Sequence, residues 1–383
     1  MSNNPYVELE KLEQSIWLDF ISKELIKSGE LHRLIKEDHL KGLTSNPSIF
    51  EKAIAQTSDY DEAINLLSKK DPHDAKAVYE NIAIADIQAA ADILRPVYEA
   101  SKGHDGFVSL EVSPHLAFDG DGTIEEAKRL WHQVDRANLM IKIPGTKKCM
   151  NAIRDLISNG INVNVTLLFS VDAYRDAAKA YLDGLGDRAI KGLPINSVNS
   201  VASFFVSRID VKIDKLLEKF AQDNEGNKDQ ALALQGLVAI ANAKMAYSAY
   251  KEIYATEQAK SIIRQGGQPQ KLLWASTGTK NPNYSDVLYV DNLIGKNTVN
   301  TLPPETLKAF RDHGKARLTI ENDVMQAKQI MNELSKFNID FKVCCDELLI
   351  DGVKIFADSF DKLLLAVDKK LRHVVQEDHK KKV

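Results

Sequence analysis

Short apolar segments alternate with longer segments of helical spacing along nearly the whole chain. Eight of the short segments are predicted strands, because they are rich in β-prone residues and end at turn-forming residues. They cover residues 15–19, 42–46, 107–112, 138–144, 161–168, 198–206, 271–276 and 297–302. Strands that alternate with helices are typical of parallel βα units, and eight is the number that closes a barrel.

Helical spacing is found before, between and after these strands. The predicted helices cover residues 6–14, 21–36, 48–67, 71–100, 123–136, 147–158, 171–182, 209–220, 231–263, 305–312, 321–336 and 358–374. The sequence therefore predicts a (β/α)8 TIM-type barrel with an extra N-terminal helix, a long helical insertion between strands six and seven, and C-terminal helices. We expect a single barrel domain over residues 1–383, with its core at about 15–312 and a helical extension at about 321–374. An open doubly wound sheet is the main alternative, but no Gly-rich turn follows the first strand.

The predicted strands have one apolar and one polar face, whereas strands buried on both sides of an open sheet are apolar throughout. Side chains alternate along a strand, so in the first strand Asp19 faces away from the helices. In the seventh strand we expect Leu273 and Ala275 to face the helices, and Trp274 and Ser276 to face the interior. In a closed barrel all the polar faces point to one interior.

Polar side chains gather near the C-terminal ends of the strands, where barrel active sites are built. They include Asp19, Asn46, Glu111, Lys142, Asn164, Thr166 and Ser276. A lysine is expensive to bury without a partner, so Lys142 either pairs with a carboxylate or takes part in chemistry. A buried amine suggests Schiff-base chemistry on a carbonyl substrate, with Asp19 and Glu111 sharing the proton transfers.

The remaining candidates suit a polyhydroxylated, anionic substrate. Hydroxyl and amide groups that could hold such a substrate and a catalytic water belong to Thr44, Asn46, Asn164, Thr166, Ser203 and Ser276. Arg208 follows the sixth strand and Lys280 the seventh, where barrels often bind phosphate, and a cationic residue there fits a sugar phosphate.

Composition limits the classes of protein to consider. The chain has 383 residues, 44% of them hydrophobic and 27% charged, which is ordinary for a globular protein. A net charge of -4 gives no basic field for nucleic acid or an anionic membrane. No apolar stretch predicts a membrane span or a signal peptide, and three cysteines suggest a reducing compartment, so we expect a cytoplasmic protein. The nine histidines lack metal-binding spacing, so no metal site is predicted.

Five motifs carry a resemblance to a known family. They are Thr44–Ser48 (TSNPS), Leu139–Pro144 (LMIKIP), Asn162–Ser170 (NVNVTLLFS), Ser200–Arg208 (SVASFFVSR) and Trp274–Pro282 (WASTGTKNP). In this order they resemble transaldolase motifs, and the resemblance runs from about residue 5 to residue 370. The last motif, with the long segment before it, resembles the longer bacterial subgroup of that family.

The resemblance implies a (β/α)8 barrel that works by a class I aldolase-type mechanism without metal or cofactor. It implies transfer of a dihydroxyacetone unit from sedoheptulose 7-phosphate or fructose 6-phosphate to glyceraldehyde 3-phosphate or erythrose 4-phosphate, in the non-oxidative pentose phosphate pathway. A related phosphosugar aldolase that releases free dihydroxyacetone, an isomerase without a covalent lysine and a non-enzymatic binding barrel are the alternatives. The sequence does not determine the oligomeric state, and a homodimer is one possibility.

The resemblance also implies a role for each candidate residue. Lys142 resembles the Schiff-base lysine, Asp19 the acid/base at the C3–C4 bond, and Glu111 and Thr166 the pair that positions a catalytic water. The substrate-binding set is Asn46 and Asn164 for the intermediate, Ser203 for a hydroxyl, Phe205 in the pocket wall, Arg208 for phosphate, and Thr44 and Ser276 beside them. Two positions depart from the family: Lys280 stands in for a second arginine, and Ser113 replaces an aspartate.

Overall fold

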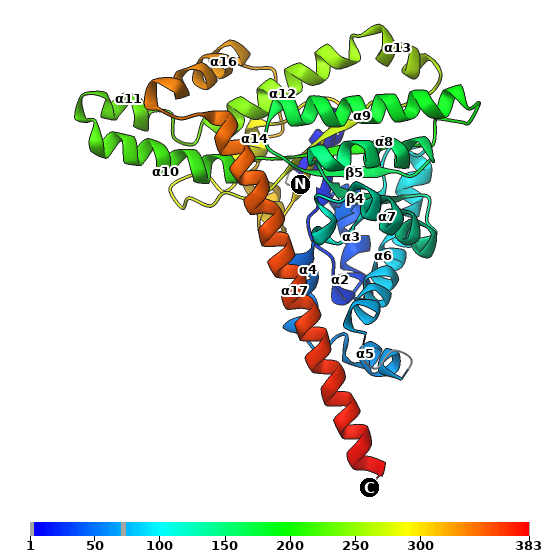
Figure 1. Cartoon of the computed structure of the whole chain (residues 1–383). Coiled ribbons are helices and arrows are strands. Elements are labelled where there is room, and N and C mark those ends of the chain that lie inside the picture. Colours follow the sequence, from blue (N-terminus) through cyan, green and yellow to red (C-terminus); the bar gives the residue numbers. More distant parts are fainter. Residues whose placement is uncertain (1–3, 70–73, 383) are drawn as a thin grey trace.

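Eight parallel strands close into a barrel in the computed structural model of the protein, which describes residues 4–69 and 74–382 (Figure 1). β1 pairs with β8 to complete the ring. The strands are β1 (Gln14–Leu18), β2 (Gly42–Thr44), β3 (Phe107–Glu111), β4 (Leu139–Pro144), β5 (Val163–Leu168), β6 (Ser200–Phe205), β7 (Lys271–Ala275) and β8 (Thr298–Leu302). The predicted barrel is confirmed, and each strand overlaps its predicted segment. Both chain ends and the first residues of the helix predicted over 71–100 lie outside the described residues.

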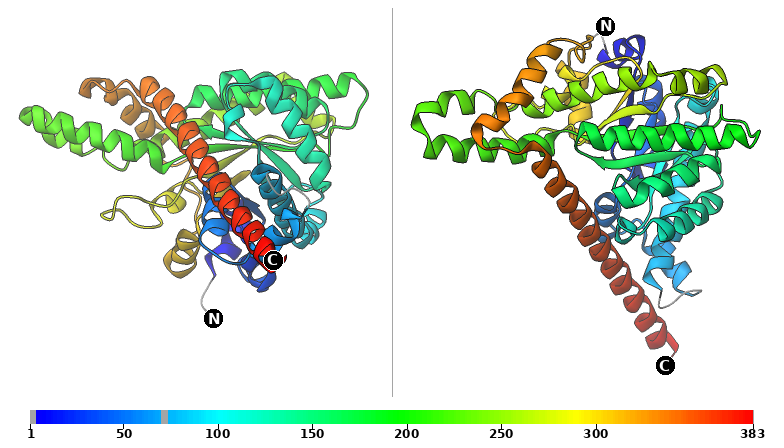
Figure 2. Two further views of the ribbon diagram at one scale, coloured as in Figure 1. Left: turned by 60° about the horizontal axis from the view of Figure 1, so that its bottom comes forward. Right: turned by 45° about the horizontal axis from the view of Figure 1, so that its top comes forward.

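Helices surround the barrel and extend the chain beyond it (Figure 2). They are α1 (Pro5–Lys11), α2 (Lys23–Lys27), α3 (Glu30–Glu37), α4 (Pro47–Ala55), α5 (Asp61–Ser68), α6 (Ala75–Ala100), α7 (Gly120–Val134), α8 (Met150–Ser158), α9 (Val171–Ile190), α10 (Ser207–Asp223), α11 (Lys228–Leu232), α12 (Val238–Tyr254), α13 (Glu257–Arg264), α14 (Leu288–Asn292), α15 (Pro304–His313), α16 (Val324–Glu333) and α17 (Phe341–Lys382). The extra N-terminal helix is α1, and the insertion between strands six and seven is formed by α10 to α13. None of the described helices combines the length and the apolar character needed to cross a membrane.

Three predicted helices are each divided in the structure. Residues 21–36 form α2 and α3, residues 48–67 form α4 and α5, and residues 231–263 fall in α11, α12 and α13. Gly29 and Gly236 have positive φ angles of 83° and 70° and stand between α2 and α3 and between α11 and α12. A helix does not continue through a residue in the left-handed conformation, so the 3.6-residue periodicity predicted helices that were too long at Gly29 and Gly236.

The C-terminal helix is much longer than predicted, because α17 begins at Phe341 instead of residue 358. Its buried positions are Cys344, Cys345, Leu348, Gly352, Phe356, Phe360, Leu363, Val367 and Leu371, which from Cys345 onward are spaced by three or four residues. This is the period of a helix with one packed face. Gly352 lies on this packed face, where a side chain would be crowded: a Cβ there would lie only 3.0 Å from Cδ2 of Leu167. Figures 1 and 2 show α17 running obliquely past the barrel and projecting beyond it.

The predicted faces of β7 are wrong. Its register with β6 puts Leu273 and Ala275 on the interior face, and Ala275 lines the cavity at the barrel mouth. Trp274 points outward and packs against Phe204, with ring centroids 6.1 Å apart at 90°. Ser276 nevertheless reaches the cavity, because its φ of 56° turns the chain at the end of the strand.

Candidate active site

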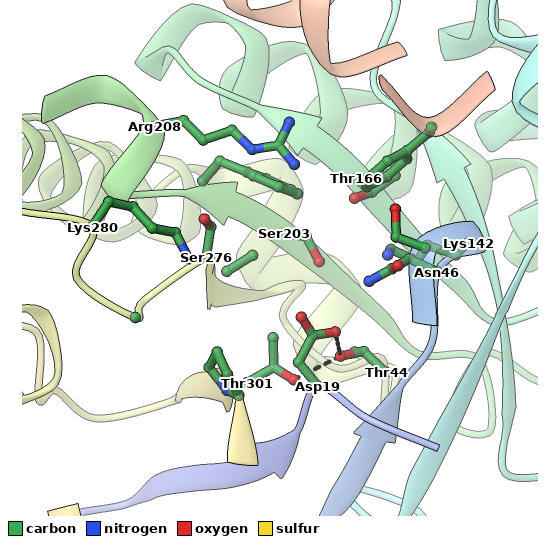
Figure 3. Close-up of a pocket in the computed structure, with 16 residues that line it drawn as sticks. Asp19, Thr44, Asn46, Lys142, Thr166, Ser203, Arg208, Ser276, Lys280 and Thr301 are labelled. Carbon is green, nitrogen blue, oxygen red and sulfur yellow. Dashed lines mark hydrogen bonds between the residues drawn. The ribbon is translucent and has the colours of Figure 1, made fainter. Parts of the chain in front are cut away.

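A cavity of about 160 Å³ opens at the C-terminal mouth of the barrel (Figure 3). It is lined by Asp19, Thr44, Asn46, Ser48, Lys142, Thr166, Ser203, Phe205, Arg208, Ala275, Ser276, Gly278, Lys280, Thr301, Pro303 and Phe356. Ten of the twelve predicted site residues are in this set. The other two, Glu111 and Asn164, are the register partners of Lys142 on the neighbouring strands β3 and β5.

Lys142 is the buried cation near the centre of the site. Its side chain is 6% exposed, and Nζ lies 3.3 Å from Oε2 of Glu111, whose side chain is 4% exposed. Nζ also donates a hydrogen bond to the backbone oxygen of Ser45 at 3.1 Å. Lys142 is therefore paired with a carboxylate, which was one of the two predicted alternatives. The same pairing puts a proton acceptor directly beside the amine.

Glu111 is held close to the lysine but is poorly hydrogen-bonded. Within the described part of the chain, neither carboxylate oxygen has a hydrogen-bond partner of good geometry. Burial raises the pKa of the Glu111 carboxyl, and the nearby Lys142 charge opposes this only in part. A raised pKa makes the carboxyl a better proton acceptor, which suits a group in acid–base catalysis.

Asp19 directly follows β1 and lines the cavity. Its Oδ1 accepts a hydrogen bond of 2.7 Å from the Thr44 hydroxyl, which lies 2.7 Å from the Thr301 hydroxyl (Figure 3). Burial raises the pKa of Asp19, opposed mainly by the charge of Lys142 and by the Thr44 hydrogen bond. Asp19 therefore lines the cavity itself, whereas Glu111 is joined to it through Lys142, and the two carboxyl groups have different partners.

A bulge in β5 shapes the wall that carries Thr166. The register between β5 and β6 shifts between Val165 and Leu168, and Leu167 has a φ of 60°. Thr166 has the same strand parity as Asn164 and lines the cavity beside this bulge, and among the described residues its hydroxyl has no hydrogen-bond partner. This hydroxyl is therefore available to a ligand or a water.

The amide side chains at the mouth are fixed by hydrogen bonds. Asn164 Oδ1 accepts from Ser203 at 2.7 Å, and Asn164 Nδ2 donates to Ser109 at 3.0 Å. Asn46 caps α4, because its Oδ1 accepts from the backbone N–H of Ile49 at 3.0 Å. The cap fixes the orientation of the Asn46 amide at the cavity wall.

Cationic groups lie on the side of the cavity opposite Asn46 and Lys142 (Figure 3). Arg208 is in the first turn of α10, and its Cζ lies 5.1 Å from the ring centre of Phe205. Its Nη1 is buried and has no hydrogen-bond partner among the residues described. Lys280 is on the loop after β7 and is largely exposed. A buried N–H group without a protein partner is a donor that a ligand or a water can use.

Sequence reasoning missed two notable members of the cavity wall. Thr301 lies near the C-terminal end of β8, and the strand-end rule that found Lys142 could have found it. Phe356 comes from α17, and a helical position gives no such signal. No group of histidine, cysteine or acidic side chains within residues 4–69 and 74–382 has the arrangement of a metal site.

The fold and the site together define the class of the protein. It is a (β/α)8-barrel enzyme whose site is built around a buried lysine, flanked by two carboxyl groups and a cationic wall. The model of the transaldolase/fructose-6-phosphate aldolase family matches residues 16–367. The chain belongs to this family.

Full-length relatives agree with this assignment. The chain is 46% identical to "Transaldolase 2" of Nostoc sp., over 97% of this chain and 99% of that protein. It is 46% identical to the transaldolase of Trichodesmium erythraeum over the same shares. Identity to the transaldolase of Thiobacillus denitrificans is 42%, over 94% of this chain and 98% of that protein. The resemblance predicted from the five motifs is confirmed.

Proposed function

We propose that this transaldolase-family enzyme transfers a dihydroxyacetone unit from a ketose phosphate to an aldose phosphate through a Schiff base on Lys142. The donor is sedoheptulose 7-phosphate or fructose 6-phosphate, and the acceptor is glyceraldehyde 3-phosphate or erythrose 4-phosphate. The observation that carries the proposal is the buried Lys142 amine, 3.3 Å from the Glu111 carboxylate in a cavity with a cationic wall.

The reaction begins with attack of the Lys142 amine on the ketose C2 carbonyl. Proton transfer to the former carbonyl oxygen gives a carbinolamine, which loses water to form an iminium ion. Glu111 is the carboxyl group paired with the amine, and together with the Thr166 hydroxyl it holds the water that leaves here and attacks in the last step. The raised pKa of Glu111 suits a group that accepts and returns a proton.

Asp19 acts at the bond that breaks. It accepts the proton of the C4 hydroxyl as the C3–C4 electron pair moves into the iminium, so that an aldose phosphate leaves and an enamine stays on Lys142. The same steps in reverse join the enamine to the acceptor aldehyde. The hydrogen bond from Thr44 orients the Asp19 carboxylate throughout.

The remaining side chains hold the substrate. Asn46, Asn164, Ser203 and Ser276 bind its hydroxyl groups or the enamine, and Phe205 forms part of the wall. Arg208, with an unpartnered buried N–H group within the described chain, binds the phosphate, and Lys280 adds a second positive charge in place of the arginine of other family members.

Reductive trapping tests this proposal. Incubation with fructose 6-phosphate and borohydride reduces the iminium to a stable secondary amine, and peptide mass mapping finds the modified residue. We expect the adduct on Lys142. An active enzyme with an unmodified Lys142 contradicts the proposal.

A phosphosugar aldolase is the second candidate, because the matching family also contains fructose-6-phosphate aldolases. Omitting the acceptor separates the two. A transaldolase releases at most one equivalent of aldose phosphate per site, whereas an aldolase continues and accumulates free dihydroxyacetone. The relatives named transaldolase support transfer.

We further propose a cytoplasmic location and no nucleic-acid partner. The three cysteines, which are free thiols in the structure, and the net charge of -4 support this. A homodimer stays a prediction, which analytical ultracentrifugation of the purified chain tests.

A further inference from the structure

The long helix α17 is tied to the barrel at several points along its length. Ser359 Oγ accepts a hydrogen bond of 2.7 Å from Ser48 at the start of α4. Asp361 lies 2.8 Å from His115, and the Cys345 thiol donates to the backbone oxygen of Phe169. These contacts fix the position of the helix relative to the mouth of the barrel.

Phe356 is the side chain that α17 places in the active site. It is 4% exposed and lines the same cavity as Lys142 and Arg208. Its ring centre lies 5.6 Å from Nζ of Lys142 and 5.7 Å from Cζ of Arg208. The ring therefore stands at cation–π distance from both cationic groups, the amine and the guanidinium.

Arg208 has two aromatic neighbours, Phe356 and Phe205, at 5.7 and 5.1 Å from its Cζ. An aromatic ring attracts a guanidinium without accepting its N–H bonds in the way a carboxylate does. Nη1 of Arg208 is buried and, among the described residues, has no hydrogen-bond partner. The two rings thus stabilise the cation and leave donors for a ligand.

Arg208 also lies beside the neighbouring turn of α17. A Cβ at Gly352 would lie 3.4 Å from Nη1 of Arg208, an ordinary contact distance, and 3.0 Å from Cδ2 of Leu167. The guanidinium therefore lies against the helix one turn from Phe356.

We propose that Phe356 is a positioning residue for phosphate recognition: with Phe205 it holds the Arg208 guanidinium by ring contacts, so that the unpartnered Nη1 donor meets the substrate phosphate. The proposal rests on the proposed function, which makes Arg208 the phosphate ligand. It extends the active site to the C-terminal helix, about 150 residues from Arg208 along the chain.

The test compares two donors that differ only by the phosphate, fructose 6-phosphate and fructose. Phe356→Leu removes the ring and keeps an apolar side chain. We expect it to lower kcat/KM for fructose 6-phosphate about tenfold, mainly through KM, and to change kcat/KM for fructose less than about twofold. Phe356→Tyr keeps a ring and should retain most of the phosphate preference. Competitive inhibition by inorganic phosphate, which should weaken in Phe356→Leu, gives a binding readout that needs no turnover of fructose.

Phe360→Leu is the matched control, because Phe360 lies one turn further along α17 and is also buried. Its ring packs against Tyr79 and His115, at 5.7 and 6.0 Å, and does not line the cavity. It should leave the phosphate preference unchanged. If Phe356→Leu and Phe360→Leu lower the rates with both donors equally, the role of Phe356 is only structural and the proposal is overturned.

Arg208→Ala separates this inference from the proposed function. Loss of phosphate preference in Arg208→Ala together with an unchanged preference in Phe356→Leu overturns the inference alone. A wild-type enzyme with no phosphate preference, or with no trapped Lys142, overturns the proposed function itself.

Discussion

Two pairs of carboxyl groups with raised pKa values lie near the barrel mouth, and their surroundings differ. Asp210 and Asp214, on α10, each accept a backbone N–H and a tyrosine hydroxyl. The donors are Ala239 N at 2.7 Å and Tyr289 at 2.9 Å for Asp210, and Gly236 N at 3.1 Å and Tyr284 at 2.7 Å for Asp214. In the pair that we propose to be catalytic, Asp19 has the Thr44 hydroxyl, and Glu111 has the Lys142 charge without a well-oriented hydrogen bond among described residues.

Burial raises the pKa of all four carboxyl groups, so burial and residue type do not distinguish the pairs. Their partners do. Asp210 and Asp214 join α10 to the start of α12 and to the segment after β7, and donors of the protein satisfy them. Asp19 and Glu111 keep acceptor capacity for a substrate or a water. Carboxyl oxygens with few hydrogen bonds therefore distinguish Asp19 and Glu111, the proposed catalytic pair, from Asp210 and Asp214, whose hydrogen bonds join parts of the fold.

Replacing Lys142 should have the largest effect. We expect Lys142→Met to lose on the order of 10⁴ or more in transfer rate, because a covalent route no longer exists. Lys280→Met is the control, since Lys280 lines the same cavity but is exposed and lies on a loop. It should still form the borohydride-trapped adduct. Substantial turnover by Lys142→Met would show that the chemistry is not covalent, as in an isomerase.

Asp19→Asn should stop the reaction after the Schiff base has formed. The amide can still accept the Thr44 hydrogen bond but cannot take the C4 hydroxyl proton, so we expect cleavage to slow by about 10²–10⁴-fold. Single-turnover experiments should find trapped Lys142 adduct while release of aldose phosphate is lost. If the adduct is lost in parallel with release, Asp19 has an earlier role than assigned.

Glu111→Gln should act on the opposite half of the reaction. Removing the carboxylate beside the amine slows formation and hydrolysis of the Schiff base, and we expect a loss of about 10²–10³-fold in turnover. The rate of adduct trapping should fall with it, in contrast to Asp19→Asn. Equal trapping rates in the two variants would contradict the division of labour between the carboxyl groups.

Much of this site was predictable because period-two alternation and the strand-end rule act locally. They placed Asp19, Lys142 and Thr166 correctly. For β7 the alternation was right, but the two faces were assigned the wrong way round: Trp274 packs against Phe204 outside the barrel, and Leu273 faces the interior. Ser276 reached the cavity through a positive φ that the pattern does not encode.

The contacts between distant elements could not be predicted in this way. Phe356 belongs to the packed face of an amphipathic helix, and only its docking brings it to Lys142 and Arg208. Asp210 and Asp214 have the four-residue spacing of an exposed helix face, yet α12 and the segment after β7 bury them. The place of Phe356 and the burial of the two aspartates both depend on tertiary packing, which the periodicity of the sequence does not specify.

Asp210→Asn should have the smallest effect on catalysis and a defined effect on stability. Burial raises the pKa of Asp210 from about 3.8 to about 7, so between these values the native state keeps a proton that the unfolded state has lost. The free energy of unfolding therefore contains a contribution that is complete below about pH 4 and declines as pH rises to about 7, with a slope of at most ~1.4 kcal/mol per pH unit. Asparagine cannot ionise, and it can still accept the Ala239 N–H and donate to the Tyr289 oxygen.

Urea unfolding at about pH 5 and at about pH 8 measures this decline. Part of it should persist in Asp210→Asn, because Asp19 and Glu111 also have raised pKa values and contribute with the same sign. The variant should nevertheless lose less stability than the wild type over this interval. Asp223→Asn, at the exposed end of the same helix, is the matched control and should keep the wild-type decline. If Asp210→Asn instead loses as much stability as the wild type on going to about pH 8, Asp210 is ionised in the folded protein at low pH, and the contrast between the two carboxyl pairs does not extend to their proton binding.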